Sequence, residues 1–85
     1  MAYEVILKPS AKRALDNLPT KGKVRVIEEL ERLAQNPRRH GVIKLEAETD
    51  LYRVRVGSYR AVFTIEDEQL VVLVLKIGHR REVYR

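Results

Sequence analysis

The chain has 85 residues, with 17 Lys and Arg against 12 Asp and Glu, and its formal net charge is +5. Hydrophobic residues make up 45% of the chain, which is typical of a folded globular domain and excludes a disordered basic tail. The absence of cysteine excludes disulfides, thiolate metal sites and a thiol nucleophile. We expect one domain over residues 1–85, cytoplasmic, with no cofactor, no metal and no membrane span.

The positive charge favours a polyanionic partner, either nucleic acid or an acidic protein. A merely soluble basic domain is the alternative.

The first half of the chain is typical of a strand followed by a helical hairpin. Residues 3–8 alternate apolar and polar side chains, as in a short strand. Ser10 is a suitable N-cap for a helix over residues 11–18, and Thr20 is suitable for a second helix that ends before Pro37. Apolar residues recur at helical spacing in both segments, so each helix is expected to bury one face.

The second half is typical of a sheet. Residues 42–48 alternate and predict an edge strand, while residues 51–56 and 59–65 predict two strands around a Gly-Ser turn. Residues 70–75 are all apolar, which predicts a central strand covered on both faces. The order β-α-α-β-β-β predicts an α+β fold, with the helical hairpin packed on one face of an antiparallel twisted sheet.

The Gly-Ser turn also predicts a register. In a two-residue hairpin Arg55 faces Arg60, and side-chain alternation places these two with Arg53 on the face away from the apolar residues. Like charges directly opposite one another cost about 0.2–1 kcal/mol, so folding alone does not favour this arrangement. Guanidinium groups bind phosphate through two parallel hydrogen bonds, which predicts a phosphodiester-binding face. A solvated face paired with Glu46 or Glu48 is the alternative.

The C-terminal residues add cations and an aromatic ring after the last strand. Residues 78–81 read Gly-His-Arg-Arg, and Tyr84 follows them. An unpaired RNA base stacks on such a ring, so the tail favours binding of single-stranded RNA. A packed C-terminal anchor is the alternative role of Tyr84.

These motifs stand in a particular order: Met-Ala-Tyr-Glu-Val at the start, Asn-Pro-Arg after the helices, Tyr-Arg-Val-Arg-Val at 52–56, Gly-Ser-Tyr-Arg-Ala-Val-Phe at 57–63 and Gly-His-Arg-Arg-Glu-Val-Tyr at 78–84. In this order they resemble the RelE/ParE toxin superfamily, and within it the RelE branch. The resemblance implies a type II toxin with a RelB-like antitoxin, a ribosome and mRNA as partners, and operator DNA bound only through the antitoxin. The RelE branch implies cleavage of mRNA in the ribosomal A site, where a 2′-hydroxyl attacks the adjacent phosphate.

The resemblance implies catalytic roles for a basic and aromatic set: Arg53, Arg55, Arg60, Arg80 and Tyr84. Arg60 would contact the scissile phosphate, and Tyr84 would stack on the mRNA. The best-known members have lysines in place of Arg53 and Arg55, and arginine does not accept a proton near neutral pH. The general base is therefore either His79, with an ordinary imidazole, or absent, with charge stabilisation supplying the rate.

Two other functions stay open. One is a ParE-like toxin that inhibits DNA gyrase, although such a binder does not need phosphate-facing arginines together with Tyr84. The other is a non-catalytic module that only binds its antitoxin or acts as its corepressor.

Overall fold

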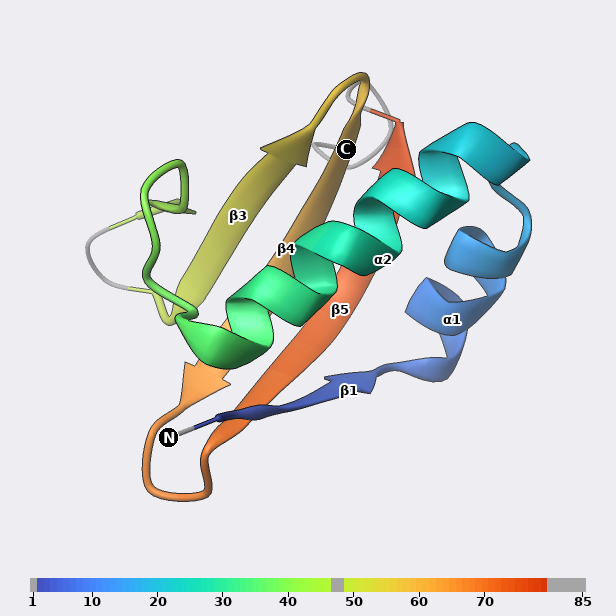
Figure 1. Cartoon of the computed structure of the whole chain (residues 1–85). Coiled ribbons are helices and arrows are strands. Elements are labelled where there is room, and N and C mark those ends of the chain that lie inside the picture. The colour runs from blue at the N-terminus through green and yellow to red at the C-terminus, as the bar shows by residue number, and fades with distance from the viewer. Residues whose placement is uncertain (1, 47–48, 80–85) are drawn as a thin grey trace.

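Helices and strands follow one another in the predicted order in this computed structural model, which describes residues 2–46 and 49–79. The elements are β1 (Glu4–Leu7), α1 (Pro9–Asp16), α2 (Thr20–Gln35), β2 (Ile43–Lys44), β3 (Leu51–Val56), β4 (Tyr59–Glu66) and β5 (Val71–His79). In Figure 1 the long helix α2 crosses in front of the sheet, and α1 lies beside it above β1. The predicted α+β class is confirmed.

The sheet is mixed rather than wholly antiparallel. Its strand order is β1-β5-β4-β3-β2, and β1 pairs with β5 in parallel while the other pairs are antiparallel. The predicted antiparallel sheet is therefore wrong for one pair. Because β1 and β5 are separated by the helical hairpin and three strands, the connection is long enough for a parallel pair. The apolar strand is internal, as predicted.

The ends of several elements differ from the sequence prediction. α1 begins at Pro9 after Lys8, so Ser10 lies inside the helix instead of capping it. Proline suits the first helical position, because its fixed φ is helical and its missing N–H is not needed there. α2 begins at Thr20 with Pro19 as its N-cap, and neither helix has a side-chain cap. The predicted edge strand 42–48 is reduced to the two residues of β2, and residues 47–48 lie outside the described part.

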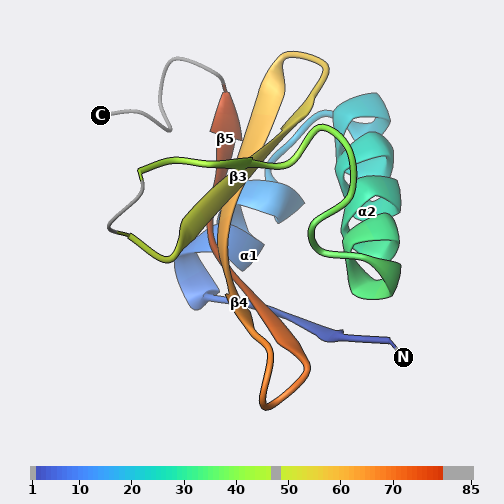
Figure 2. The same ribbon diagram turned by 90° about the vertical axis from the view of Figure 1, so that its left-hand side faces the viewer.

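The core lies between the helices and one face of the sheet. Phe63 and Leu33 are fully buried at its centre. Both helices contribute to the same cluster as β3, β4 and β5, so they cover the same face: Ala11, Leu15, Val26, Leu30, Leu33, Val54, Ala61, Phe63, Ile65, Val72, Val74 and Ile77. Figure 2, seen along the sheet, shows α2 standing to one side of it. No helix of the described residues is long and apolar enough to cross a membrane.

A bulge in β5 determines which face the end of this strand presents. Phe63 pairs with Val74, but Val62 pairs with Lys76, so Leu75 is an extra residue in the ladder. Before the bulge the even-numbered residues of β5 face the helices, and after it the odd-numbered residues do.

The buried residues confirm this change of face. Val74 and Ile77 both belong to the core although they are three positions apart. Beyond the bulge His79 pairs with Tyr59 on the helix side, and Gly78 pairs with Arg60 on the opposite side.

Candidate nucleic-acid interface

Three arginines share the sheet face that is turned away from the helices. The predicted register is confirmed, because Arg55 lies directly opposite Arg60 and Arg53 lies opposite Val62. Gly57 begins the turn with φ +59°, as the first central residue of a type II′ turn requires. The hairpin of β3 and β4 therefore brings these arginines together on one surface, which we call the arginine face.

The arginines of this face differ in exposure. Arg55 is exposed, Arg53 is half-buried and Arg60 is only 5% exposed. The sequence predicted an open face and did not indicate that Arg60 is buried. Arg60 lies on β4, the middle strand of the sheet, between Arg55 and the buried Gly78. A guanidinium restricted in this way loses less rotamer freedom when it binds an anion, which is the preorganisation that stabilises developing charge.

His79 lies on the other face of the sheet. Its ring meets the ring of Tyr59 edge-on, with centroids 6.1 Å apart and planes at 84°. Because Tyr59 lies on the helix side, the sheet separates His79 from Arg55 and Arg60. The structure thus does not bring the predicted proton acceptor to the arginine face.

Two further predicted residues, Arg80 and Tyr84, lie outside the described residues, as does Glu48 of the alternative ion-paired face.

Sequence reasoning also missed one basic residue. Lys76 is exposed and pairs with Val62, which lies on the arginine face, so Lys76 joins that face. The step of three between the apolar residues Val74 and Ile77 is the sequence signal that could have revealed it.

Two carboxylates of the scaffold, those of Glu29 and Asp16, form ion pairs with basic side chains outside the arginine face. Glu29 is buried in α2 and accepts a hydrogen bond from Arg39 at 2.6 Å. Asp16 at the end of α1 lies 3.3 Å from Lys12 and 3.4 Å from Lys23, and these cations lower its pKa. The pair of Glu29 with Arg39 joins α2 to the following loop, and the pair of Asp16 with Lys23 joins the two helices, while the pair with Lys12 lies within α1. All three stabilise the scaffold rather than the arginine face. Within residues 2–46 and 49–79, no group of three or more His, Asp or Glu side chains is placed to hold a metal ion.

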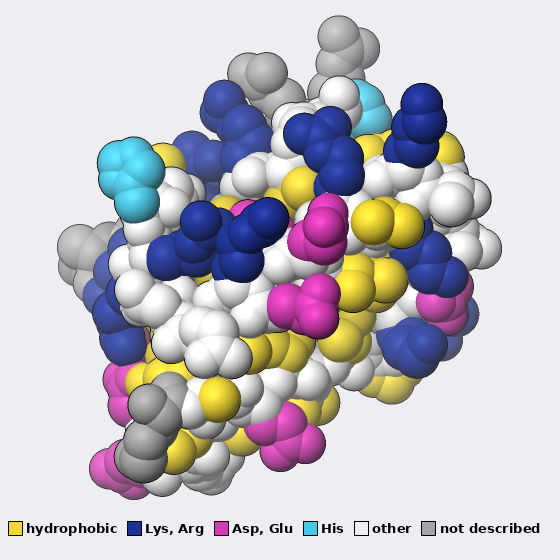
Figure 3. All heavy atoms as spheres, in the orientation of Figure 1, with side chains coloured by type: hydrophobic (Ala, Val, Ile, Leu, Met, Phe, Trp, Pro, Cys, Tyr) yellow, Lys and Arg dark blue, Asp and Glu magenta, His cyan; other side chains and the backbone are white. Residues whose placement is uncertain are grey.

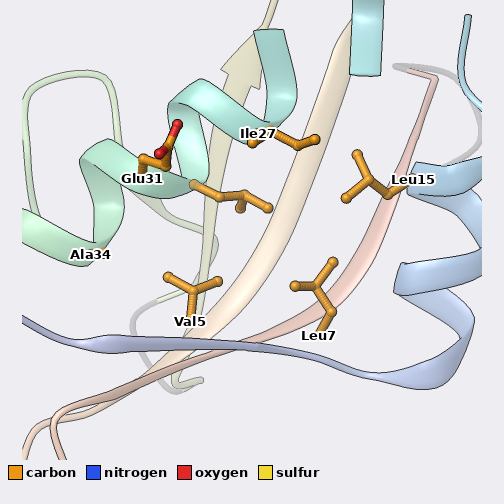
Figure 4. A pocket seen from close by; sticks show the side chains of 7 residues that line it. Val5, Leu7, Leu15, Ile27, Glu31 and Ala34 are labelled. Carbon is orange, nitrogen blue, oxygen red and sulfur yellow. The ribbon is translucent and has the colours of Figure 1, made fainter. Parts of the chain in front are cut away.

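The helix side carries a different kind of surface. Figure 3 shows a strip of apolar side chains exposed between α2 and β1, with acidic side chains beside it and basic side chains along the upper part of the face. The strip is a groove of about 300 Å³, lined by Val5, Leu7, Leu15, Ile27, Leu30, Glu31 and Ala34. Figure 4 shows Val5 and Leu7 of β1 pointing from below toward Ile27 of α2. The apolar groove and the arginine face therefore lie on opposite faces of the sheet.

Comparison with known proteins agrees with this architecture. Residues 5–84 match the family described as "ParE toxin of type II toxin-antitoxin system, parDE". Toxin RelG of Mycobacterium tuberculosis is 31% identical over 86 residues, which cover 100% of this chain and 99% of that protein.

Solved structures of toxins have the same fold. The toxin–antitoxin complex RelBE2 from Mycobacterium tuberculosis aligns with a TM-score of 0.84 and 29% identity, covering 94% of this chain and 100% of the other. The archaeal RelE–RelB complex from Pyrococcus horikoshii aligns with a TM-score of 0.82 and 33% identity, covering 96% and 99%. The isolated E. coli RelE toxin aligns with a TM-score of 0.82 and 28% identity, covering 98% and 92%.

The helical hairpin packed on a mixed five-stranded sheet is thus a fold that this chain shares with RelE toxins. The chain belongs to the ParE toxin family of type II toxin–antitoxin systems, and in sequence and structure it is RelE-like. The resemblance inferred from the motifs is confirmed.

Proposed function

We propose that this toxin is a ribosome-dependent endoribonuclease that cleaves mRNA in the A site. The observation that carries the proposal is the register of the β3–β4 hairpin, which holds Arg55 directly opposite Arg60 with Arg53 on the same face. Opposed like charges weaken a sheet by about 0.2–1 kcal/mol, so their presence is better explained by an anionic ligand than by folding. A phosphodiester is the ligand that fits a group of guanidiniums.

In the proposed reaction the 2′-oxygen of a nucleotide forms a bond to the adjacent phosphorus, and the bond to the 5′-oxygen breaks. The products are a 2′,3′-cyclic phosphate and a free 5′-hydroxyl, so the proton lost at the 2′-oxygen is balanced by the one gained at the 5′-oxygen. Arg55 and Arg60 would stabilise the negative charge that builds up on the phosphoryl oxygens, and Arg53 would bind the RNA backbone.

Other residues have supporting roles in this proposal. Arg80 would add a cation and Tyr84 a stacking ring, as the resemblance implies. His79 does not transfer a proton in this proposal, because it contacts Tyr59 on the helix side of the sheet. Most of the rate would come from charge stabilisation and in-line positioning of the 2′-hydroxyl.

A RelB-like antitoxin is the proposed protein partner. Toxins of the same fold were solved as RelB–RelE complexes from Mycobacterium tuberculosis and Pyrococcus horikoshii. The net charge of +5 favours an acidic or amphipathic antitoxin segment. In this proposal the toxin acts in the cytoplasm, where the ribosomes are, and reaches operator DNA only through the antitoxin.

Inhibition of DNA gyrase is the second candidate function, because the matching family is described by the name ParE. Induction of the toxin in cells, followed by mapping of mRNA 5′ ends, separates the two. The proposed function predicts discrete cuts within translated frames, which disappear when translation of that message is blocked. Stalled gyrase and double-stranded DNA breaks with intact mRNA would instead support the gyrase function. Tight antitoxin binding with neither effect would indicate a non-catalytic module.

A further inference from the structure

Lys76 belongs to a group of cations that spans three strands. Arg53 on β3, Val62 on β4 and Lys76 on β5 form one row across the sheet, because Val62 pairs with both of its neighbours. The next row is formed by Arg55, Arg60 and Gly78. Directly opposite residues of neighbouring strands have Cβ atoms about 5 Å apart, so these rows place Lys76 within reach of the same bound polyanion.

The β-bulge creates this arrangement. In a regular strand Lys76 would have the same orientation as Val72 and Val74, which are fully buried against the helices. The extra residue reverses the alternation, so Lys76 emerges exposed on the arginine face. It forms no hydrogen bond or ion pair with any residue that the structure describes. Bulges next to functional sites commonly redirect a side chain in this way.

We propose that Lys76 binds a phosphate of the mRNA next to the phosphate that is cleaved; the inference rests on the function proposed above. The row positions decide the assignment, because Arg55 and Arg60 face each other while Lys76 lies one row away, beside Val62. A lysine ammonium is a compact charge that attracts the RNA backbone without the two-bond geometry of arginine. Lys76 therefore binds substrate and transition state equally, and its loss raises KM while kcat is little changed.

The test compares Lys76→Gln with Lys44→Gln, a matched control. Lys44 is also an exposed lysine in a strand, but it pairs with Tyr52, whose ring stacks on the core residue Phe63 on the helix side. Binding is measured on ribosomes programmed with an mRNA whose attacking nucleotide carries a 2′-deoxy sugar, at salt concentrations from about 0.05 to 0.3 M. Single-turnover cleavage is measured with the unmodified mRNA.

Loss of one contact to a single-stranded phosphate reduces the slope of log K against log salt by about 0.7, so Lys76→Gln should bind about three- to tenfold more weakly near 0.15 M salt. Its cleavage rate at saturating toxin should stay within about twofold of wild type, and Lys76→Arg should restore both affinity and slope. Lys44→Gln should behave as wild type.

Three results would overturn the inference. The first is a Lys76→Gln protein that binds with wild-type affinity and salt slope, while Arg55→Gln cleaves more slowly than wild type. The proposed function would then stand without Lys76. The second is the failure of wild-type toxin to bind programmed ribosomes, which would reject the proposed function and this inference together. A fall in kcat without a change in salt slope would also exclude a phosphate contact, since it would indicate a disturbed strand.

Discussion

Arg38 and Asp67, 29 positions apart, form a two-bond ion pair that ties the loop after α2 to the turn between β4 and β5. Nη1 of Arg38 donates to Oδ1 at 2.9 Å and Nη2 donates to Oδ2 at 2.8 Å. The hydroxyl of Tyr3 also donates to Oδ1, at 2.7 Å. One carboxylate thus joins the residue before β1, a loop and a turn. The guanidinium also lies 5.8 Å from the ring centre of Tyr52, so it connects this end of the sheet to β3.

Acid sensitivity is expected from this contact. Hydrogen bonds from Arg38 and then Tyr3 lower the pKa of Asp67 from 3.8 to about 2. Because the folded-state pKa is the lower one, the contribution of Asp67 to stability is complete above about pH 4 and is lost as the pH falls toward 2. Thermal unfolding from pH 2 to 6 should show a smaller acid-induced loss in Asp67→Asn than in wild type. Both side chains are about half-exposed, at 48% and 54%, so the effect should also shrink at high salt. Parallel pH curves for the two proteins would contradict this prediction.

Arg55→Gln should separate stability from activity. Removing one of two opposed charges relieves a repulsion, so the free energy of unfolding should stay unchanged or rise by up to about 1 kcal/mol. Cleavage on ribosomes should fall, because a donor to the phosphoryl oxygens is lost. Urea unfolding and single-turnover cleavage measure the two effects on the same preparation. A variant that is less stable than wild type would show that Arg55 serves the fold instead.

A substitution more conservative than alanine is needed at Arg60, because this residue is only 5% exposed. Arg60→Lys keeps the charge and most of the volume but loses the planar fork. Loss of one charge-assisted contact in the transition state costs about 2–4 kcal/mol of activation energy, a factor of about 30 to 1000. Arg60→Lys should therefore stop growth inhibition upon induction while the purified protein unfolds near the wild-type temperature. A folded Arg60→Lys protein as toxic as wild type would remove Arg60 from the catalytic set.

Replacement of Gly22 by alanine is expected to destabilise the fold. In a helix interior, alanine ordinarily stabilises the helix by about 1 kcal/mol relative to glycine. At this position, however, a Cβ would lie 2.5 Å from Cε2 and 3.0 Å from Cζ of Tyr59, and overpacking costs about 1–3 kcal/mol. Gly22→Ala should thus lower the free energy of unfolding by about 1 kcal/mol in urea titrations. In a Tyr59→Leu background, where the ring is absent, the same change should become stabilising; destabilisation in both backgrounds would point to another cause.

The parts of the fold that the sequence predicted are those set by local pattern. The hairpin register follows from a two-residue turn that contains Gly57, and the apolar faces of the helices follow from their spacing. The direction of β1 could not be predicted in this way, because alternation along a short strand is the same for parallel and antiparallel neighbours. The prediction of the N-cap residues was also wrong, because Pro9 begins α1, whereas Ser10 was expected to cap it.

The predicted register of the hairpin is confirmed, but the alternation expected along β5 does not continue beyond the bulge. Arg53, Arg55 and Arg60 share a face because the pairing of β3 with β4 is regular along its whole length. The extra residue in β5 then reverses the alternation, which moves His79 away from that face. A bulge depends on the pairing with the neighbouring strand, so strict alternation along one strand cannot predict it.

His79→Gln tests this reversal directly. An imidazole that accepted the 2′-hydroxyl proton would make the cleavage rate rise with pH as it deprotonates, and the variant would lose that rise. His79 instead lies edge-on to Tyr59, 6.1 Å between ring centroids, on the helix side of the sheet. We therefore expect His79→Gln to cleave programmed ribosomes at close to the wild-type rate, with the same pH profile. Its small effect should appear in thermal stability, because an aromatic pair of this geometry contributes about 0.5–1.5 kcal/mol. If single-turnover cleavage instead fell severalfold and the pH step vanished, His79 would be the proton acceptor and would have to reach the RNA around the end of β5.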